Sequence, residues 1–267
     1  KYYMETTVSD ICVFMNEYAS LTYAEKWDNP GLLLGHVEAP VHKIMVALDL
    51  MPEVAEQAIE EEVDLIITHH PYYFHLPSSL AVTDTKMEVM YELIKHDIAV
   101  YAAHTNLDAA RGGVNDVLAD RLGLNDVTEI PRKDCPEQGL ARIGVLGEPM
   151  ELKDFAAYVR DQLGAAHVTF AGGEEPVFKV AVVGGSGADF MDDAMAAGAD
   201  TLVTGDVKYH VAQKALNMGL NLVDGTHQLT ELPVIAHLED VLTAWCQESG
   251  RHFEVIRAHE DLVLQSI

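Results

Sequence analysis

The sequence predicts an α/β protein made of two similar α/β lobes, with mostly parallel sheets and helices packed on their faces. Two observations support this fold class. Short apolar runs of strand length alternate with amphipathic helical segments, a pattern typical of parallel sheets covered by helices. The same strand–helix–strand pattern occurs twice along the 267 residues, so we expect each copy to form one lobe.

The internal repeat matches apolar runs in the two halves of the chain. In the first copy, strands are predicted for Lys43-Ile-Met-Val-Ala-Leu-Asp49 and Val63-Asp-Leu-Ile-Ile-Thr68. In the second copy, Lys179-Val-Ala-Val-Val-Gly-Gly185 and Ala199-Asp-Thr-Leu-Val-Thr204 occupy the corresponding places with the same separation. Each copy then continues with another helix and a third strand.

The limits of the lobes follow from the repeat and from turn-forming residues. Proline, aspartate and glycine interrupt the periodic pattern between Asn125 and Gln138. We therefore expect a first lobe of residues 1–126 plus 228–267, and a second lobe of residues 127–227.

Histidines and carboxylates follow three of the predicted strands. If these strands lie side by side and parallel, their carboxyl ends bring the polar side chains to one rim. Imidazole nitrogens and carboxylate oxygens suit two divalent ions of Zn, Mn, Fe, Co or Ni, with Glu231 as the candidate bridge between them. The candidate metal ligands are His69, His70, Asp108, His227 and Glu231.

A fourth imidazole, His104, precedes Asp108 in the same His-x-x-x-carboxylate pattern that His227 forms with Glu231. Two roles are open for it, a further metal ligand or a catalytic proton shuttle. The first copy also has extra residues near 71–79, rich in aromatic side chains and proline. This segment is interpreted as a lid or pocket wall, or alternatively as a packing or subunit contact.

Substrate contacts are predicted in the second copy. The turn Gly184-Gly-Ser-Gly187 follows a predicted strand, so the N–H groups around Gly185 and Gly187 could bind an anion, or the turn is purely structural. Asp206, Lys208 and His210 follow the next strand. They are candidates for substrate binding, with structural ion pairing as the alternative.

Composition limits the classes of partner. The net charge of −26 disfavours nucleic-acid binding, which needs a basic face. It still permits an anionic small-molecule substrate, because bound cations can reverse the local field. No stretch reaches about 18 uninterrupted apolar residues, so no membrane span is expected. The acidic residues among 1–30 disfavour a secretory leader, and the three dispersed cysteines are expected to be reduced thiols, so we expect a cytoplasmic location.

Several motifs occur together along the chain. They are Trp27-Asp-Asn-Pro-Gly-Leu-Leu-Leu-Gly35, Thr68-His-His-Pro71, His104-Thr-Asn-Leu-Asp108, Thr204-Gly-Asp206 and Asp224-Gly-Thr-His-Gln-Leu-Thr-Glu231. With these motifs the chain resembles the NGG-one-interacting-factor-like family of dinuclear-metal-centre hexamers, often named type 2 homologues of GTP cyclohydrolase I. The resemblance implies a ring-like homohexamer, the five metal ligands given above, and His104 as a further active-site histidine.

These observations lead to a main hypothesis and an alternative. The main hypothesis is a dinuclear metal-dependent hydrolase of a nucleotide-like or phosphorylated small molecule. The alternative is a non-catalytic metal-binding or regulatory hexamer that stores, senses or delivers metal. The ligand set alone is compatible with both.

Overall fold

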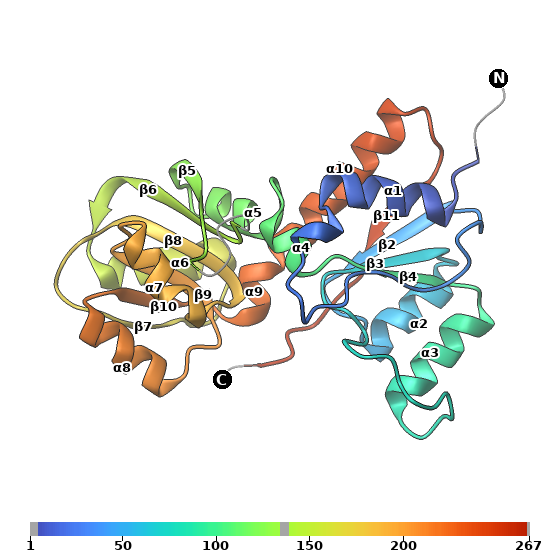
Figure 1. Ribbon diagram of the computed structural model, residues 1–267, viewed down its shortest axis with the longest axis horizontal. Coiled ribbons are helices and arrows are strands. Elements are labelled where there is room, and N and C mark those ends of the chain that lie inside the picture. Colours follow the sequence, from blue (N-terminus) through green and yellow to red (C-terminus); the bar gives the residue numbers. More distant parts are fainter. Residues whose placement is uncertain (1–4, 134–138, 266–267) are drawn as a thin grey trace. The chain divides into compact units, whose positions relative to one another are not determined.

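A computed structural model describes residues 5–133 and 139–265 of the chain (Figure 1). The chain falls into two compact units. Unit 1 comprises Lys1–Leu107 and Ile235–Asp261, and unit 2 comprises Asp108–Val234 and Leu262–Ile267.

Unit 2 begins earlier than the predicted boundary segment of residues 125–138. Asn125–Ile130 form strand β5 within unit 2, and residues 134–138 lie outside the described residues. The predicted division into two domains therefore stays a prediction. It assigns residues 1–126 and 228–267 to the first domain and residues 127–227 to the second.

Unit 1 contains a five-stranded sheet in the order β1-β4-β3-β2-β11. β2, β3, β4 and β11 pair in parallel, and β1 pairs antiparallel with β4. Ala47, Thr68 and Ala102 are register partners across β2, β3 and β4, so the residues that follow these three strands meet at one edge. The strands are β1 (Gly31–Leu34), β2 (Lys43–Ala47), β3 (Leu65–Thr68), β4 (Ala99–Ala102) and β11 (Glu254–Arg257).

Helices cover both faces of this sheet (Figure 1). α2 and α3 pack on one face, where Met45, Ile66 and Val100 share a core cluster with their apolar residues. On the other face, α1 lies beside α10, and the rings of Phe14 and Trp245 stack with centroids 4.2 Å apart. The helices are α1 (Val8–Tyr18), the 3-10 helix η1 (Leu21–Tyr23), α2 (Pro52–Glu60), α3 (Thr85–Lys95) and α10 (Pro233–Glu248), with α10 in unit 1 from Ile235 onward.

The starts of these helices follow from local chemistry. Thr7 and Asp10 form a reciprocal capping box at α1. Pro52 occupies the first turn of α2, where its missing N–H has no helical partner to lose. Asp84 caps α3 by accepting a hydrogen bond from the Met87 N–H.

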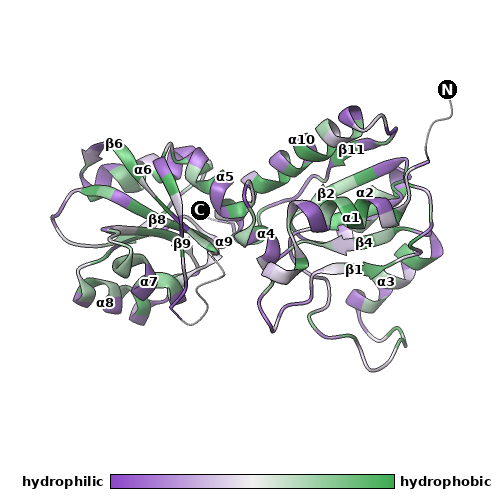
Figure 2. Ribbon diagram, turned by 45° about the horizontal axis from the view of Figure 1, so that its top comes forward, coloured by the Kyte–Doolittle hydropathy of each residue, from purple (hydrophilic) through white to green (hydrophobic). Residues whose placement is uncertain are grey.

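Unit 2 contains a six-stranded mixed sheet in the order β5-β6-β8-β9-β10-β7. β8, β9 and β10 pair in parallel and the other neighbours pair antiparallel. One face packs on α5 and α6 and the other on α7 and α8, and Figure 2 shows apolar residues concentrated in β6 and β8. The elements are α4 (Thr105–Ala109), which begins in unit 1, α5 (Val114–Arg121), β5 (Asn125–Ile130), β6 (Ala141–Met150), α6 (Leu152–Leu163), β7 (Thr169–Ala171), β8 (Val177–Ser186), η2 (Ala188–Phe190), α7 (Met191–Ala196), β9 (Thr201–Gly205), α8 (Tyr209–Met218), β10 (Asn221–Asp224) and α9 (His227–Glu231).

The α/β fold class and its internal repeat are confirmed. The parallel trio β2-β3-β4 of unit 1 has its counterpart in β8-β9-β10 of unit 2. The sheet of unit 1 is mostly parallel, and in unit 2 antiparallel strands extend both edges of the parallel trio. The condition that the three ligand-bearing strands lie side by side is met only for β3 and β4. β3 and β4 are neighbours, but β10 belongs to the second sheet because it is the counterpart of β4.

The extra residues of the first copy lie where the repeat predicts them. The connection from β3 to α3 spans residues 69–84, whereas the corresponding connection from β9 to α8 spans only residues 206–208. None of the helices in the described part of the chain combines the length and apolarity needed to cross a membrane.

Candidate functional site

Three of the predicted residues form a histidine group in unit 1. His69 and His70 directly follow β3, and His104 follows the neighbouring β4. One ring nitrogen from each lies within 4.8 Å of the other two. His69 is fully buried, and only 11% of the His104 side chain is exposed. Parallel pairing of β3 with β4 therefore positions this group, as the sequence predicted.

Each ring in this group is held through the same nitrogen. Nδ1 of His69 contacts the carbonyl oxygen of Ala103 at 2.8 Å. Nδ1 of His70 contacts Asp49 Oδ1 at 2.8 Å, and Nδ1 of His104 contacts Asp28 Oδ1 at 2.7 Å. Oxygen acceptors at Nδ1 favour the tautomer protonated there, so Nε2 is the atom suited to bind a metal or to exchange a proton.

Asp28 is a functional candidate that the sequence reasoning missed. Its side chain is fully buried and accepts hydrogen bonds from the N–H and Oγ1 of Thr105 as well as from His104. Burial acts to raise the pKa of Asp28, but these hydrogen bonds and the charge of His104 together lower it to about 2. Asp28 is therefore ionised near neutral pH, and its carboxylate lies behind His104. Trp27, in the same motif, lies against His104, with 5.8 Å between ring centroids.

Asp49 and Glu260 support the other end of the group and were also missed. Glu260 accepts hydrogen bonds from the N–H groups of Leu48 and Asp49, at 2.8 and 2.9 Å. Asp49 in turn contacts His70. Burial raises the pKa of Glu260, partly offset by these backbone hydrogen bonds. Glu260 therefore fixes the backbone from which Asp49 reaches His70.

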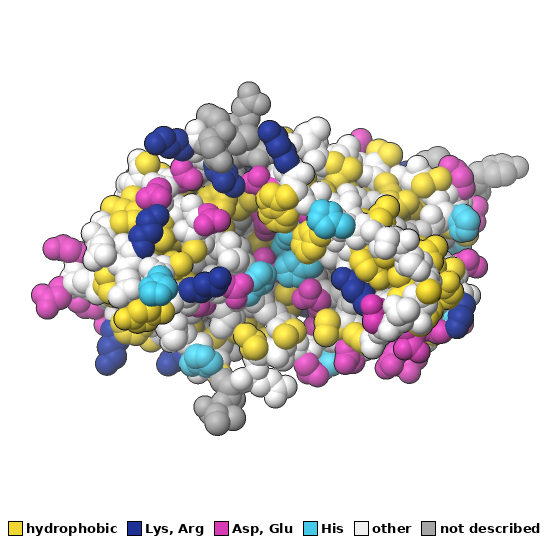
Figure 3. Space-filling model, turned by 60° about the horizontal axis from the view of Figure 1, so that its bottom comes forward, with side chains coloured by type: hydrophobic (Ala, Val, Ile, Leu, Met, Phe, Trp, Pro, Cys, Tyr) yellow, Lys and Arg dark blue, Asp and Glu magenta, His cyan; other side chains and the backbone are white. Residues whose placement is uncertain are grey.

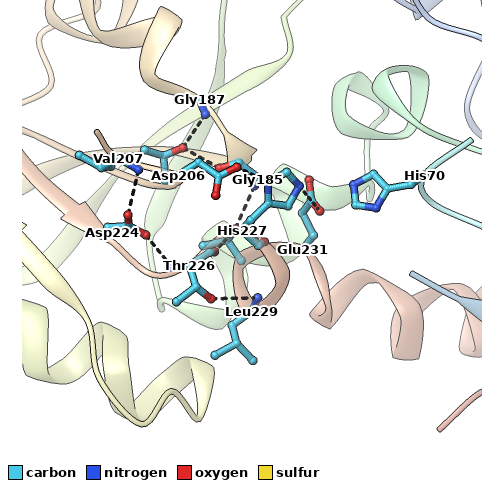
Figure 4. A network of polar contacts seen from close by, with 12 residues as sticks. His70, Gly185, Gly187, Asp206, Val207, Asp224, Thr226, His227, Leu229 and Glu231 are labelled. Carbon is cyan, nitrogen blue, oxygen red and sulfur yellow. Dashed lines mark hydrogen bonds and ion pairs between the residues drawn. The ribbon is translucent and has the colours of Figure 1, made fainter. Parts of the chain in front are cut away.

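A second group lies in unit 2, where α9 places His227 and Glu231 one turn apart (Figure 4). His227 Nε2 lies 3.1 Å from Glu231 Oε2, and His227 Nδ1 lies 2.6 Å from Asp206 Oδ2. Thr226 begins α9 and accepts a hydrogen bond from the Leu229 N–H. His227 is thus held through Nδ1 in the same way as the three histidines of unit 1.

The surroundings of His227 favour a positive charge. Its hydrogen bond to Glu231, followed by the charge of Glu231 and the contact with Asp206, raises the pKa of His227 to about 9, although burial acts in the opposite direction. An imidazole between two carboxylates is a place where a divalent cation is electrostatically favoured.

Asp206 was predicted to contact substrate, but in unit 2 its carboxylate contacts His227. This contact is the ion pair that was the alternative, and contact of Asp206 with substrate stays a prediction. Lys208 and His210 are exposed, and His210 Nδ1 contacts Gln213 Oε1 at 3.0 Å. Their contact with substrate stays a prediction.

The glycine turn does not form the expected anion cradle. The N–H groups of Gly185 and Gly187 donate to the hydroxyl oxygens of Thr230 and Thr204, at 2.9 and 2.8 Å. Both N–H groups already donate hydrogen bonds within unit 2, so they are not available to an anion. Gly185 instead allows close approach, because a Cβ at this position would lie 2.2 Å from Glu231 Oε1.

Asp108, the remaining predicted ligand, belongs to α4 and is 7% exposed. Its carbonyl accepts a hydrogen bond from Asn115, which also accepts one from the Gly184 N–H. The buried Arg142 donates to the carbonyls of Ala109 and Ala110, at 2.8 and 3.1 Å. The chain around Asp108 is therefore fixed from several sides within unit 2.

The motifs and the fold now lead to the family. The model of the Duf34/NIF3 (NGG1p interacting factor 3) family matches residues 6–261. The chain belongs to this family. This result confirms the resemblance that the five motifs indicated.

Similar proteins span nearly the same length. A GTP cyclohydrolase 1 type 2 homolog from Clostridium perfringens is 37% identical over 236 residues, which cover 87% of this chain and 90% of that protein. The crystal structure of Staphylococcus aureus hypothetical protein SA1388 has a TM-score of 0.93 at 29% identity, and the match covers 99% of this chain and 100% of that one. The Bacillus cereus protein related to NIF3 has a TM-score of 0.89 at 25% identity and covers 98% and 100%.

In this Duf34/NIF3 chain, the extra segment of residues 71–79 borders the histidine group. The ring of Phe74 lies 5.7 Å from that of His104 and 6.1 Å from that of Trp27, measured between centroids. The Tyr73 carbonyl accepts a hydrogen bond from Asn29 Nδ2 at 2.7 Å. His75 is exposed. The predicted position beside the histidines is therefore confirmed, whereas contact with substrate or with another subunit stays a prediction.

The surface matches the acidic composition. On the face drawn in Figure 3, acidic side chains are scattered over both units with fewer basic ones between them.

Proposed function

We propose that this Duf34/NIF3 chain binds two divalent transition-metal ions and hydrolyses a small anionic molecule that is nucleotide-like or phosphorylated. The main support is that all four candidate histidines are held through Nδ1, three of them by carboxylates. This arrangement is typical of metal-binding imidazoles, because it orients the ring and makes Nε2 the ligand atom. The proposed ligands are His69, His70, Asp108, His227 and Glu231.

The donor set fits such ions. It contains only imidazole nitrogen and carboxylate oxygen, which suit Zn, Mn, Fe, Co and Ni. Glu231 is the proposed bridge, because this residue is only 4% exposed and its Oε2 lies 3.1 Å from Nε2 of His227, the proposed ligand atom. When bound, the ions would supply a Lewis acid that activates water.

His104 is proposed to move the proton. Its Nε2 would accept a proton from the attacking water and return it to the leaving group. The buried anion of Asp28 holds Nδ1 and stabilises the ring while it is charged. Lys208 and His210 are proposed to contact the substrate, and the chain is proposed to assemble as a homohexamer, as its family resemblance implies.

The decisive measurement is metal content of untreated protein, with Glu231→Gln as the variant. We expect about two ions per chain in the wild type and the loss of at least one in the variant, because the bridging charge is removed. Glu248→Gln, an exposed change at the end of α10, is the matched control and is expected to keep both ions. Full metal occupancy in Glu231→Gln would contradict the bridging role.

Turnover separates the two functional hypotheses. Metal-loaded protein is to be assayed on nucleotides, cyclic nucleotides and phosphoesters. Hydrolysis that is lost in Glu231→Gln supports the enzyme. Two ions per chain without turnover would favour a non-catalytic assembly that stores, senses or delivers metal.

A further inference from the structure

A cavity of about 340 Å³ lies in unit 1 beyond the ends of β2 and β3. Its walls are formed by the residues after β2, by those after β3, and by the beginning of α3. This volume is at the lower limit of small-molecule sites, so it suits a compound of one or two rings. The lining residues that matter here are Leu50, Met51, Pro71, Tyr72, Lys86 and His70.

Most of the wall is apolar, and Tyr72 gives it a flat face. The Tyr72 hydroxyl donates a hydrogen bond to the Lys86 carbonyl at 2.9 Å. The Tyr73 ring packs edge-on against Tyr72, with centroids 5.1 Å apart. The ring of Tyr72 is therefore fixed before any ligand arrives, which reduces the entropy lost on binding.

Lys86 gives the cavity a cation. Its Nζ lies 4.8 Å from the ring centroid of Tyr72 and 4.6 Å from that of Tyr73. In the described part of the chain no carboxylate forms an ion pair with Lys86, although the chain has 43 acidic and 17 basic residues. The acidic lining residue Asp49 is hydrogen-bonded to His70 instead. The ammonium group is therefore available to an incoming anion.

We propose that this cavity binds the non-reacting part of the substrate, a planar ring with an acidic group. The ring packs against Tyr72 and Pro71, and the acidic group pairs with Lys86. The inference rests on the proposed function, because His70 lines the same cavity and is a proposed metal ligand. A molecule held here therefore places its other end beside the residues that perform the chemistry.

The test uses phenyl phosphate as the probe, with inorganic phosphate for comparison, and measures dissociation constants by calorimetry on the full chain. We expect phenyl phosphate to bind at least about fivefold more tightly than inorganic phosphate, because only its ring buries apolar surface. Lys86→Gln is expected to weaken phenyl phosphate binding about fivefold, the effect of one exposed ion pair. Lys86→Arg is expected to retain binding, and Tyr72→Leu to weaken it while preserving an apolar wall.

Lys95→Gln is the matched control, because Lys95 ends the same helix α3 and pairs with Glu92 outside the cavity lining. Equal losses in Lys86→Gln and Lys95→Gln would overturn the proposal, as would equal affinity for the two probes or the absence of phenyl phosphate binding. Titrating chelator-treated protein with phenyl phosphate measures binding to the cavity without any contribution from bound metal ions. Phenyl phosphate binding that depends on Lys86 but not on metal supports the proposed cavity site. A wild-type protein that binds no metal ions would refute the proposed function but not the cavity site.

Discussion

Position 185 has to be glycine because Glu231 fills the space beside it. Gly185 adopts a φ of +69°, and a Cβ there would lie 2.2 Å from Glu231 Oε1 and 3.0 Å from its Cδ. Restoring ordinary van der Waals contact requires the carboxylate to move by roughly 1 Å. Metal–ligand distances tolerate only about 0.2 Å, so Gly185→Ala is expected to remove Glu231 from the proposed ligand set.

Backbone strain alone is measured by Gly164→Ala. Gly164 has a φ of +66°, and no atom lies within 4 Å of a Cβ built there. An alanine in the left-handed conformation costs about 1–2 kcal/mol of folding free energy, and both variants share this cost. Only Gly185→Ala adds the collision with Glu231. We therefore expect a metal affinity roughly 10–100-fold weaker, with the loss of about one ion per chain, in that variant alone.

The assay combines elemental analysis of untreated protein, metal titration after chelation, and urea unfolding of both variants. Unfolding establishes that both proteins are folded and measures how much the collision destabilises Gly185→Ala beyond the backbone strain that the two variants share. A folded Gly185→Ala protein with the metal content and affinity of Gly164→Ala would refute the assignment of Glu231 as a ligand.

Four further outcomes are expected. If His104 is a proton shuttle, His104→Ala keeps both metals and slows turnover by roughly 10²–10⁴-fold; a drop in metal content would identify it as a ligand. Arg142 is 1% exposed and donates hydrogen bonds to the carbonyls of Ala109 and Ala110, so Arg142→Met is expected to lower the free energy of urea unfolding by about 3–5 kcal/mol. The control Arg160→Met, at a half-exposed arginine, is expected to lower it by less than about 1 kcal/mol. Thr7→Ala removes the cap of α1 and costs about 1 kcal/mol in urea unfolding. The hydrogen bond from the Thr7 N–H lowers the pKa of Asp10, so this carboxylate stabilises the fold near neutral pH and ceases to do so in acid. Between neutrality and about pH 3, Asp10→Asn should therefore lose less stability than the wild type, and an equal loss would contradict the assignment.

The fold is predictable where the chain repeats itself. The apolar runs that end at Thr68 and Thr204 match in length and pattern, and both form strands between parallel neighbours. Strands outside the repeat were not predictable, because their pairing depends on contacts distant in sequence rather than on local pattern. The position of β10 shows the same limit of local pattern. A strand followed by histidine and glutamate resembles β4 locally, and only the register of the repeat shows that it belongs to another sheet.

The site was predictable to the extent that strand ends define it. His69, His70 and His104 follow apolar strands directly, so parallel pairing alone brings them together. Asp28 and Glu260 could not be found in this way, because each acts through a hydrogen bond to residues far away in the sequence. Periodicity determines which face a residue occupies, but it does not determine which polar partner that residue meets.

The two copies of the repeat differ in how a carboxylate supports a histidine. In the first copy, Asp49 follows β2 and holds His70, which follows β3. In the second copy, Asp206 follows β9 and holds His227, which follows β10. By the alignment of the repeat, Asp206 occupies the place of His70. The supporting carboxylate and its histidine therefore follow β2 and β3 in the first copy. In the second copy they follow β9 and β10, which are the counterparts of β3 and β4.

This shift explains why the second copy cannot carry its own histidine pair. By the alignment of the repeat, Gly205 occupies the place of His69, and a Cβ there would lie 2.5 Å from the backbone nitrogen of His227. The start of α9 fills the space that a side chain at position 205 would need. A histidine at this position would push α9 away and with it both His227 and Glu231. Only the first copy can therefore supply paired histidines, and the second copy supplies the histidine and carboxylate of α9.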